Sequence, residues 1–211
     1  MIRAFGLCGV ILAAGDSTRM GTDKALLPWP PVSSGQAAIG TFLSAAIQSL
    51  SLDTDAVLVV VGRNARSLAP VVYSAGAAMI ENPDPDLGQF SSLQVGLREV
   101  LNRGRDAAIV TLVDRPPVSE QTIRTLTDAY ARAFQRLQWG VVPTFQGKHG
   151  HPFIAGRELI EEFLQAPATS NARDIRHRHS GKIVYVEVDD PMTVANINTP
   201  EDYAAIHPNP R

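Results

Sequence analysis

Short apolar runs alternate along the chain with stretches in which apolar residues recur every three or four positions. Most of the runs lack an inner polar face, which is typical of strands covered on both sides of a sheet. They are Leu7–Ala14, Ala56–Val61, Ala77–Ile80, Ala107–Val113, Trp139–Val142 and Ile183–Val188. Between them, helical periodicity extends from Ile39 to Leu50, from Leu93 to Leu101 and from Ile123 to Leu137. This alternation predicts an α/β fold with a doubly wound, mostly parallel sheet.

The sequence contains few features that would mark a boundary between two domains. We find no repeat and no Ser/Gly-rich linker, and we expect the proline-rich segment 28–35 to be a surface loop rather than a domain boundary. Ser119 is placed to cap the helix that follows it. We therefore expect one domain over residues 1–211.

Composition and charge exclude several classes of protein. The net charge of −2 gives no general attraction for nucleic acid or an anionic membrane. The single cysteine, Cys8, lies in an apolar run and is expected to be a small buried side chain. The first five residues lack a signal-peptide pattern, and no apolar run reaches the ~20 residues needed to span a bilayer. These features favour a cytoplasmic protein without nucleic-acid or membrane partners.

The loop after the first predicted strand combines glycines with cations. Gly15, Arg19, Gly21 and Lys24 follow Leu12-Ala13-Ala14 directly. Small residues let backbone N–H groups approach phosphate oxygens, and Arg and Lys can then neutralise the phosphate charge. The spacing fits neither a P-loop nor a G-x-G-x-x-G dinucleotide fingerprint. An ordinary β–α turn with two solvated cations is the less favoured alternative.

A carboxylate follows another buried strand. Asp114 ends the run Ala107–Val113, and ligands of doubly wound sheets bind at the carboxyl ends of the strands. One or two carboxylates together with substrate phosphates are the usual environment of Mg²⁺. Asp114 is therefore a candidate magnesium ligand, although a turn-capping aspartate is the simpler alternative.

The segment from Leu12 to Pro28 resembles the opening motif of the MobA-like NTP transferases, which include molybdenum cofactor cytidylyltransferases and guanylyltransferases. The resemblance continues at 82–93, at 114–118, at Gly150-His151-Pro152 and at 196–203, whereas residues 29–40 depart from it. It implies a Rossmann-like fold of the nucleotide-diphospho-sugar transferase type. It also implies a magnesium-dependent nucleotidyltransferase in which Arg19, Lys24 and Asp114 are catalytic.

The resemblance further implies the residues that bind the nucleotide. They are Leu12, Ala13, Ala14, Gly15, Ser17, Arg19, Lys24, Asn82, Gly88, Ser91 and Ser92. A helix that starts near Ser91 would also point free N–H groups at an anion, although Ser91 can equally be a plain helix cap. Ala14 stands where guanylyl enzymes more often have a second glycine. Because its methyl group would crowd a purine, we expect CTP to be favoured over GTP. The pair Asn196 and Asn198 points the other way, since guanylyl-type relatives often carry Asn-x-Asn where many cytidylyl-type relatives carry Asp-x-Asp.

The last two segments concern the metal and the acceptor. The resemblance implies a second metal contact at Asn196 or Asn198, of which we favour Asn198. The residues that follow, Thr199, Pro200 and Asp202, fit a structural helix cap. The resemblance places His149, Gly150 and His151 toward the acceptor. Lys148 would add positive charge there, and we expect His177, Arg178 and His179 to lie on the surface.

The predicted reaction is attack by an acceptor phosphate on the α-phosphorus of an NTP, with release of pyrophosphate, and the resemblance indicates molybdopterin as the acceptor. A sugar-phosphate or methylerythritol-phosphate nucleotidyltransferase is the nearest alternative. A non-catalytic NTP-binding module is the alternative from another class. A molybdoenzyme or chaperone partner is not readable from these residues.

Overall fold

The computed structural model describes residues 5–15, 23–31 and 37–206. Its main sheet has the strand order β10-β7-β9-β6-β1-β4-β5, with β8 paired to β7. The strands are β1 (Leu7–Leu12), β4 (Ala56–Val61), β5 (Ala78–Glu81), β6 (Ala107–Leu112), β7 (Gly140–Phe145), β8 (Lys148–His149), β9 (Phe153–Gly156) and β10 (Ile183–Glu187). β1 is parallel to β4 and β6, whereas β9 is antiparallel to β6 and β7. The predicted mostly parallel α/β sheet is confirmed.

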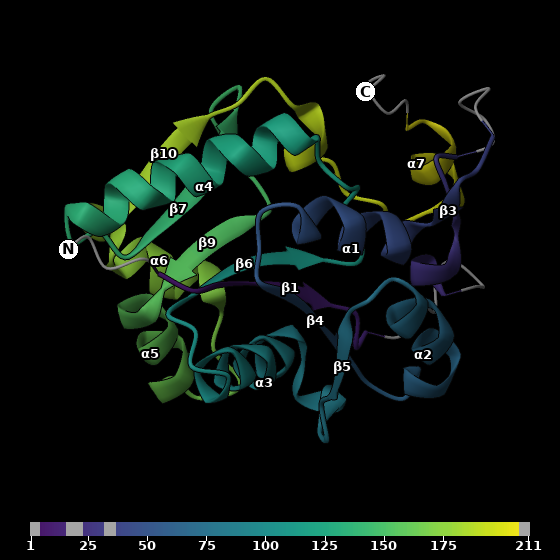
Figure 1. Ribbon diagram of the computed structural model, residues 1–211, viewed down its shortest axis with the longest axis horizontal. Coiled ribbons are helices and arrows are strands. Elements are labelled where there is room, and N and C mark those ends of the chain that lie inside the picture. The colour runs from purple at the N-terminus through teal and green to yellow at the C-terminus, as the bar shows by residue number, and fades with distance from the viewer. Residues whose placement is uncertain (1–4, 16–22, 32–36, 207–211) are drawn as a thin grey trace.

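Helices cover both faces of this sheet (Figure 1). One core cluster contains side chains of α1 (Phe42–Ser51), α2 (Ala65–Ser74) and α4 (Glu120–Gln135). The other contains side chains of α3 (Gln89–Asn102), α5 (Arg157–Gln165) and α6 (Ala172–Arg178). On β1, Ile11 belongs to the first cluster and Val10 to the second, and neither is exposed to solvent. Burial on two faces explains why the apolar runs show little alternation.

We expected the proline-rich segment 28–35 to be a surface loop, but its first residues form a short strand. β2 (Pro28–Trp29) pairs with β3 (Gly40–Thr41), and the Trp29 ring is buried edge-on against Phe42 with ring centroids 5.1 Å apart. The large apolar area of a tryptophan favours burial even where prolines indicate a loop. Residues 32–36 lie outside the described residues.

Several boundaries also differ from the predictions. α1 begins at Phe42 with Thr41 as its cap, and Ile39 is exposed. α4 ends at Gln135, because Leu137 takes a left-handed backbone with φ 56°. The periodicity did not predict α2, α5 or α6, and α2 contains Pro70 in its interior.

Other local predictions are confirmed. Cys8 is buried, and Ser119 caps α4 by accepting a hydrogen bond from the Thr122 N–H. Thr199 and Asp202 form a capping box at the start of α7 (Pro200–Ala204). Within the described ranges, no helix is long and apolar enough to cross a membrane.

Candidate active site

A cleft of about 280 Å³ opens where β1 and β6 end. Neighbouring parallel strands bring their following loops to one edge of the sheet, so the Gly15 and Asp114 loops meet there. The lining residues that the sequence had marked as functional are Leu12, Ala14, Gly15, Lys24, Gly88, Ser92, Asp114 and Asn198. Residues far apart in the chain are thus collected around one space.

Asn64 fixes the two ends of the first loop. Its Nδ2 atom donates to the carbonyl of Ala13 and to Oδ2 of Asp23, at 2.9 Å in each case. The other carboxylate oxygen of Asp23 accepts from the Ala25 N–H at 3.0 Å. These bonds set the start of the 3-10 helix η2 (Lys24–Leu26) beside the end of β1. Asn64 was not singled out in the sequence, because only the fold brings it to this loop.

Lys24 is held next to the predicted metal ligands. Its Nζ atom donates to the carbonyl of Ile197 at 2.6 Å, and the Ile197 N–H donates to the carbonyl of Asp114 at 3.0 Å. Asn198, the next residue, lines the cleft, whereas Asn196 is exposed and does not. The segment 196–198 is therefore anchored between Lys24 and Asp114 and directs Asn198 to the cleft.

The Asp114 carboxylate has an unused oxygen. Oδ1 is buried and has no hydrogen-bond partner among the described residues. A buried carboxylate oxygen without a donor is costly unless a cation satisfies it. No group of three or more His, Cys, Asp or Glu side chains is placed to hold a metal in the described ranges. Magnesium needs only one or two protein oxygens beside water and phosphates, so Asp114 and Asn198 fit it.

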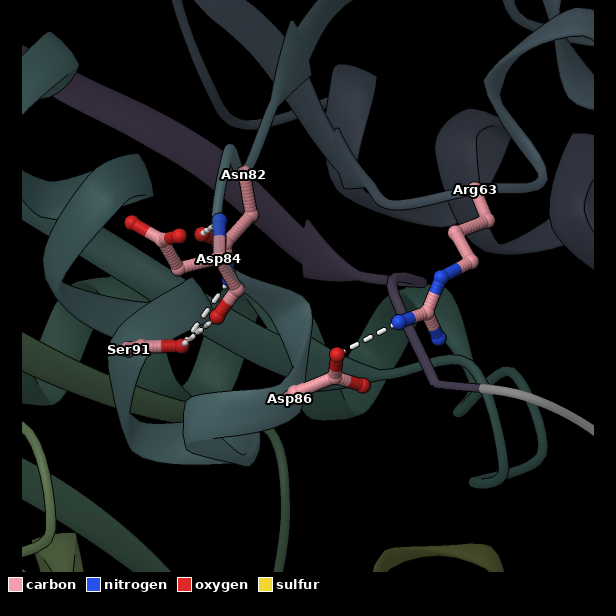
Figure 2. Close-up of polar contacts among 5 residues, drawn as sticks. All are labelled: Arg63, Asn82, Asp84, Asp86 and Ser91. Atoms are coloured by element: carbon pink, nitrogen blue, oxygen red, sulfur yellow. Dashed lines mark hydrogen bonds and ion pairs between the residues drawn. The ribbon is translucent and has the colours of Figure 1, made fainter.

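Asn82 braces the loop between β5 and α3. Its Nδ2 atom donates to the hydroxyls of Ser91 (2.9 Å) and Ser92 (3.0 Å), and its Oδ1 atom accepts from the Asp84 N–H at 3.0 Å. Figure 2 shows Asn82 and Ser91 pointing toward each other inside this loop, and Asp86 paired with Arg63 on its outer side. The exposed Arg63–Asp86 pair adds little stability, so the buried Asn82 amide is the main brace.

The residues predicted to bind the nucleotide thus fall into two groups. Gly88 and Ser92 line the cleft, with Gly88 in a backbone conformation (φ 94°) that favours glycine. Ala13, Asn82 and Ser91 do not line it, although burial alone does not separate the groups, since Asn82, Ser91 and Ser92 are 5%, 6% and 4% exposed. Ser17 and Arg19 lie outside the described residues.

A second cleft, of about 900 Å³, adjoins the first and shares Leu12, Gly88, Gln89 and Leu112 with it. It is lined by the predicted acceptor residues His149, Gly150 and His151. The two clefts together could hold two ligands side by side.

Gly150 brings the chain close to the loop after β10. Its N–H donates to the Pro143 carbonyl and that of His151 donates to the Thr193 carbonyl, both at 2.8 Å. A Cβ atom on Gly150 would lie 2.6 Å from the Thr193 carbonyl oxygen, so glycine is required for this approach. The backbone bonds fix the position of the His151 ring.

His151 is kept neutral by its surroundings. Burial, together with the positive charges of Arg176 and Arg115, lowers the pKa of His151 to about 3, against the opposing effect of a hydrogen bond to the Val110 carbonyl. The Nδ1 atom is buried without a partner in the described structure. The ring therefore offers one unused nitrogen at the wall of the second cleft.

The turn before His151 is a tight hairpin between β7 and β8. Gln146 and Gly147 have φ values of 50° and 75°, as the two central residues of a type I′ turn require. The exposed His149 ring stacks on Tyr185 of β10, with centroids 4.5 Å apart. His149 therefore forms part of a wall that the sheet supports.

Three arginines of the second cleft, Arg115, Arg173 and Arg176, were not predicted from the sequence. Arg115 follows Asp114 directly, and Arg176 lies on α6, where we expected His177, Arg178 and His179 on the surface. His177 and Arg178 are exposed. His179 is instead half-buried, because it packs on Trp139 and bonds to Glu162 at 3.0 Å. The spacing of so short a helix did not reveal which side faces the sheet.

Comparison with known proteins identifies the family of this chain. The model of the MobA-like NTP transferase domain matches residues 9–183. The molybdenum cofactor cytidylyltransferase of Escherichia coli is 24% identical over 195 residues, which is 92% of each chain. A probable molybdenum cofactor guanylyltransferase of Rhodopirellula baltica is 28% identical over 93% of this chain and 89% of its own.

Solved structures share the fold. A crystal structure of Rv0371c from Mycobacterium tuberculosis H37Rv has a TM-score of 0.75 and 25% identity, over 95% of this chain and 96% of that chain. A second structure of Rv0371c, a complex with manganese, has a TM-score of 0.69 and 22% identity, over 94% and 96%. Because the family model spans most of the sequence, this chain belongs to the MobA-like NTP transferase family and is a nucleotidyltransferase.

Proposed function

We propose that the protein transfers the nucleotidyl group of an NTP, CTP in preference to GTP, to the phosphate of molybdopterin or its molybdenum-bearing form, and releases pyrophosphate. One observation carries the proposal. The cleft that collects Lys24, Asp114 and Asn198 opens into a larger cleft that contains His151. A two-substrate transfer needs two such adjoining spaces. The names of the relatives from Escherichia coli and Rhodopirellula baltica support the molybdenum cofactor as acceptor.

In this proposal the reaction depends on position and charge. An oxygen of the acceptor phosphate attacks the α-phosphorus, and the bond to the leaving pyrophosphate breaks. The acceptor is already anionic, so no general base is needed. Lys24 offsets negative charge on the phosphates, as its place beside Asp114 permits.

Asp114 and Asn198 would hold Mg²⁺, with Asp114 supplying the unused Oδ1 atom. When bound, the ion neutralises charge on the triphosphate. Gly88 and Ser92 would contact the nucleotide, while Asn82 and Ser91 would act indirectly by bracing their loop.

The preference for CTP rests on Ala14. It lines the nucleotide cleft and is largely buried. The Gly62 backbone packs closely against it, since a Cβ atom on Gly62 would come within 2.8 Å of the Ala14 carbonyl oxygen, and Asn64 holds the neighbouring Ala13 carbonyl. A methyl group that cannot move away favours the smaller base.

Two other functions compete with this proposal. A sugar-phosphate or methylerythritol-phosphate acceptor would use the same nucleotide cleft. The unpartnered His151 nitrogen in the second cleft favours an acceptor with polar heteroatoms, such as a pterin. A pure NTP-binding module would have no need of the second cleft.

Pyrophosphate release from CTP and Mg²⁺, measured with and without molybdopterin, tests the proposal. We expect release only when the acceptor is present. Asp114→Asn should reduce the rate by about 10²-fold or more without loss of folding, because it removes one charge at a strand end. Release that is independent of molybdopterin, or full activity of folded Asp114→Asn, would contradict the proposal.

A further inference from the structure

The second cleft has an unusual balance of charge. Its lining contains Arg115, Lys148, Arg173 and Arg176 and, among the described residues, neither aspartate nor glutamate. The chain as a whole has a net charge of −2. The positive charge is therefore concentrated in this hollow, where it attracts an anion.

Arg176 and Arg115 are partly buried, whereas Lys148 and Arg173 are exposed, and Arg176 is the charge with the most unused donors. Its Nε and Nη1 atoms are buried and have no hydrogen-bond partner in the described structure. The described residues place no carboxylate at ion-pair distance from it, whereas Arg63, Arg103, Arg105 and Arg157 each have one. Burial lowers the pKa of Arg176 to about 10, so its guanidinium is still charged at neutral pH.

One contact holds the Arg176 guanidinium in place. Its Cζ atom lies 4.4 Å from the centroid of the Phe153 ring, a cation–π contact that leaves the N–H groups at the guanidinium edge unused. A buried charge without hydrogen bonds is costly, and the contact with a ring face compensates only part of that cost. The unused donors need an acceptor from outside the described chain.

Arg115, which also lines this cleft, has a further unused donor. Its Nη1 atom donates to the carbonyls of Val194 (3.2 Å) and Ala195 (2.8 Å), which fixes its direction. Its Nε atom is buried without a partner. Arg115, Arg176 and His151 all line this cleft, and the centroid of the Phe153 ring lies 5.5 Å from that of the His151 ring and 4.4 Å from the Arg176 Cζ atom.

We propose that Arg176, assisted by Arg115, binds an oxyanion of the acceptor. The planar guanidinium matches the paired oxygens of a phosphate or a carboxylate. The inference rests on the proposed function, because the cleft is assigned to the acceptor there. The nucleotide cleft adjoins it at Gly88 and Leu112, so an acceptor held by Arg176 would occupy the space next to the nucleotide.

Direct anion binding tests this role without turnover. The protein is saturated with α,β-methylene-CTP and Mg²⁺, which occupies the nucleotide cleft, and is titrated with inorganic phosphate or malonate in a calorimeter. The phosphate and malonate arms distinguish a phosphate from a carboxylate. The variants are Arg176→Gln and the matched control Arg178→Gln, an exposed arginine of the same helix that does not line the cleft.

We expect wild type and Arg178→Gln to bind one of the two anions with equal Kd. Arg176→Gln should weaken that binding at least tenfold and leave the affinity for α,β-methylene-CTP unchanged. Arg176→Lys, which keeps the charge but not the paired N–H geometry, should bind with intermediate affinity and serves if Arg176→Gln does not fold. Binding of neither anion to wild type, or unchanged binding to Arg176→Gln, would overturn the proposal.

Thermal unfolding separates a ligand role from a packing role. A binding arginine without a partner should not stabilise the anion-free protein, so the Tm of Arg176→Gln should equal or exceed that of wild type. A lower Tm combined with unchanged anion binding would assign Arg176 to packing on Phe153. If Arg176 binds an anion but molybdopterin is not a substrate, the anion-binding role of Arg176 stands and only the proposed identity of the acceptor is wrong.

Discussion

Asn82→Ala should destabilise the protein and weaken nucleotide binding only through the loop that Asn82 braces. The variant loses the hydrogen bonds of Nδ2 to Ser91 and Ser92 and that of Oδ1 from the Asp84 N–H. Ser91 still donates to the Gly88 carbonyl at 2.8 Å, whereas the buried Ser92 hydroxyl has no second side-chain bond among the described residues. The damage therefore centres on the start of α3.

The size of the effect follows from this count. Each lost hydrogen bond contributes about 1 kcal/mol, and a buried hydroxyl without a partner adds a further penalty of similar size. The Asp84 residue is exposed, so water can replace its bond. Together these terms predict a loss of about 2–4 kcal/mol of unfolding free energy, which lowers the Tm of a chain of this length by about 5–15 °C.

Calorimetry of Asn82→Ala and titration with CTP at a temperature where it is folded check this prediction. The exposed Asn102 at the end of α3 supplies a control, because its side-chain bond to Glu99 is 3.3 Å long and Asn102→Ala should change the Tm very little. An unchanged Tm for Asn82→Ala with a large loss of CTP affinity would refute our reasoning and make Asn82 a direct nucleotide ligand.

Three further predictions concern the two clefts. Lys24→Ala should lower kcat about 10²-fold with a smaller effect on the KM for CTP, because its charge acts most strongly in the transition state; steady-state kinetics that show a change in KM alone would contradict this. Ala14→Gly should shift the ratio of Kd values for CTP and GTP toward GTP by about tenfold, and an unchanged ratio in competitive titration would exclude Ala14 as the determinant. The depressed pKa of His151, about 3 against 6.5 in the unfolded chain, makes the unfolded state bind more protons between these pH values. The contribution of neutral His151 to the unfolding free energy is therefore complete above pH 6.5 and falls below it, by up to about 1.4 kcal/mol per pH unit. Urea unfolding at pH 7 and pH 5 should show that His151→Gln loses less unfolding free energy between these pH values than wild type does. Equal losses in the two proteins would contradict the assignment.

The sheet and the cleft where β1 and β6 end could be predicted because their signals are local. The apolar run at Leu7–Leu12 marks a strand buried on both faces, and the residues that follow such strands in a parallel sheet meet at one edge. Gly15 and Asp114 could therefore be placed together before any coordinates were known. Trp29 shows the limit of local reasoning, because its burial depends on Phe42 and on the distant Ile197.

The acceptor cleft could be predicted only in part. The Gly150-His151 pair was identified from its resemblance, and the close approach to Thr193 gives a physical reason for the glycine. Arg176 gave no sequence signal, because a seven-residue helix with basic residues on several sides does not reveal which of them faces inward. The role of Asn82 was equally hidden, since an asparagine can bind a ligand or brace a loop with the same amide group.

Transfer of label from CTP to molybdopterin tests the central claim most directly. The wild-type protein is incubated with Mg²⁺, molybdopterin and CTP labelled either at the α-phosphorus or at the γ-phosphorus, and the products are separated. We predict that the α-label appears in the pterin product and the γ-label in pyrophosphate, in equal amounts. Retention of both labels in CTP, or release of the α-label as free CMP without a pterin product, would contradict the account.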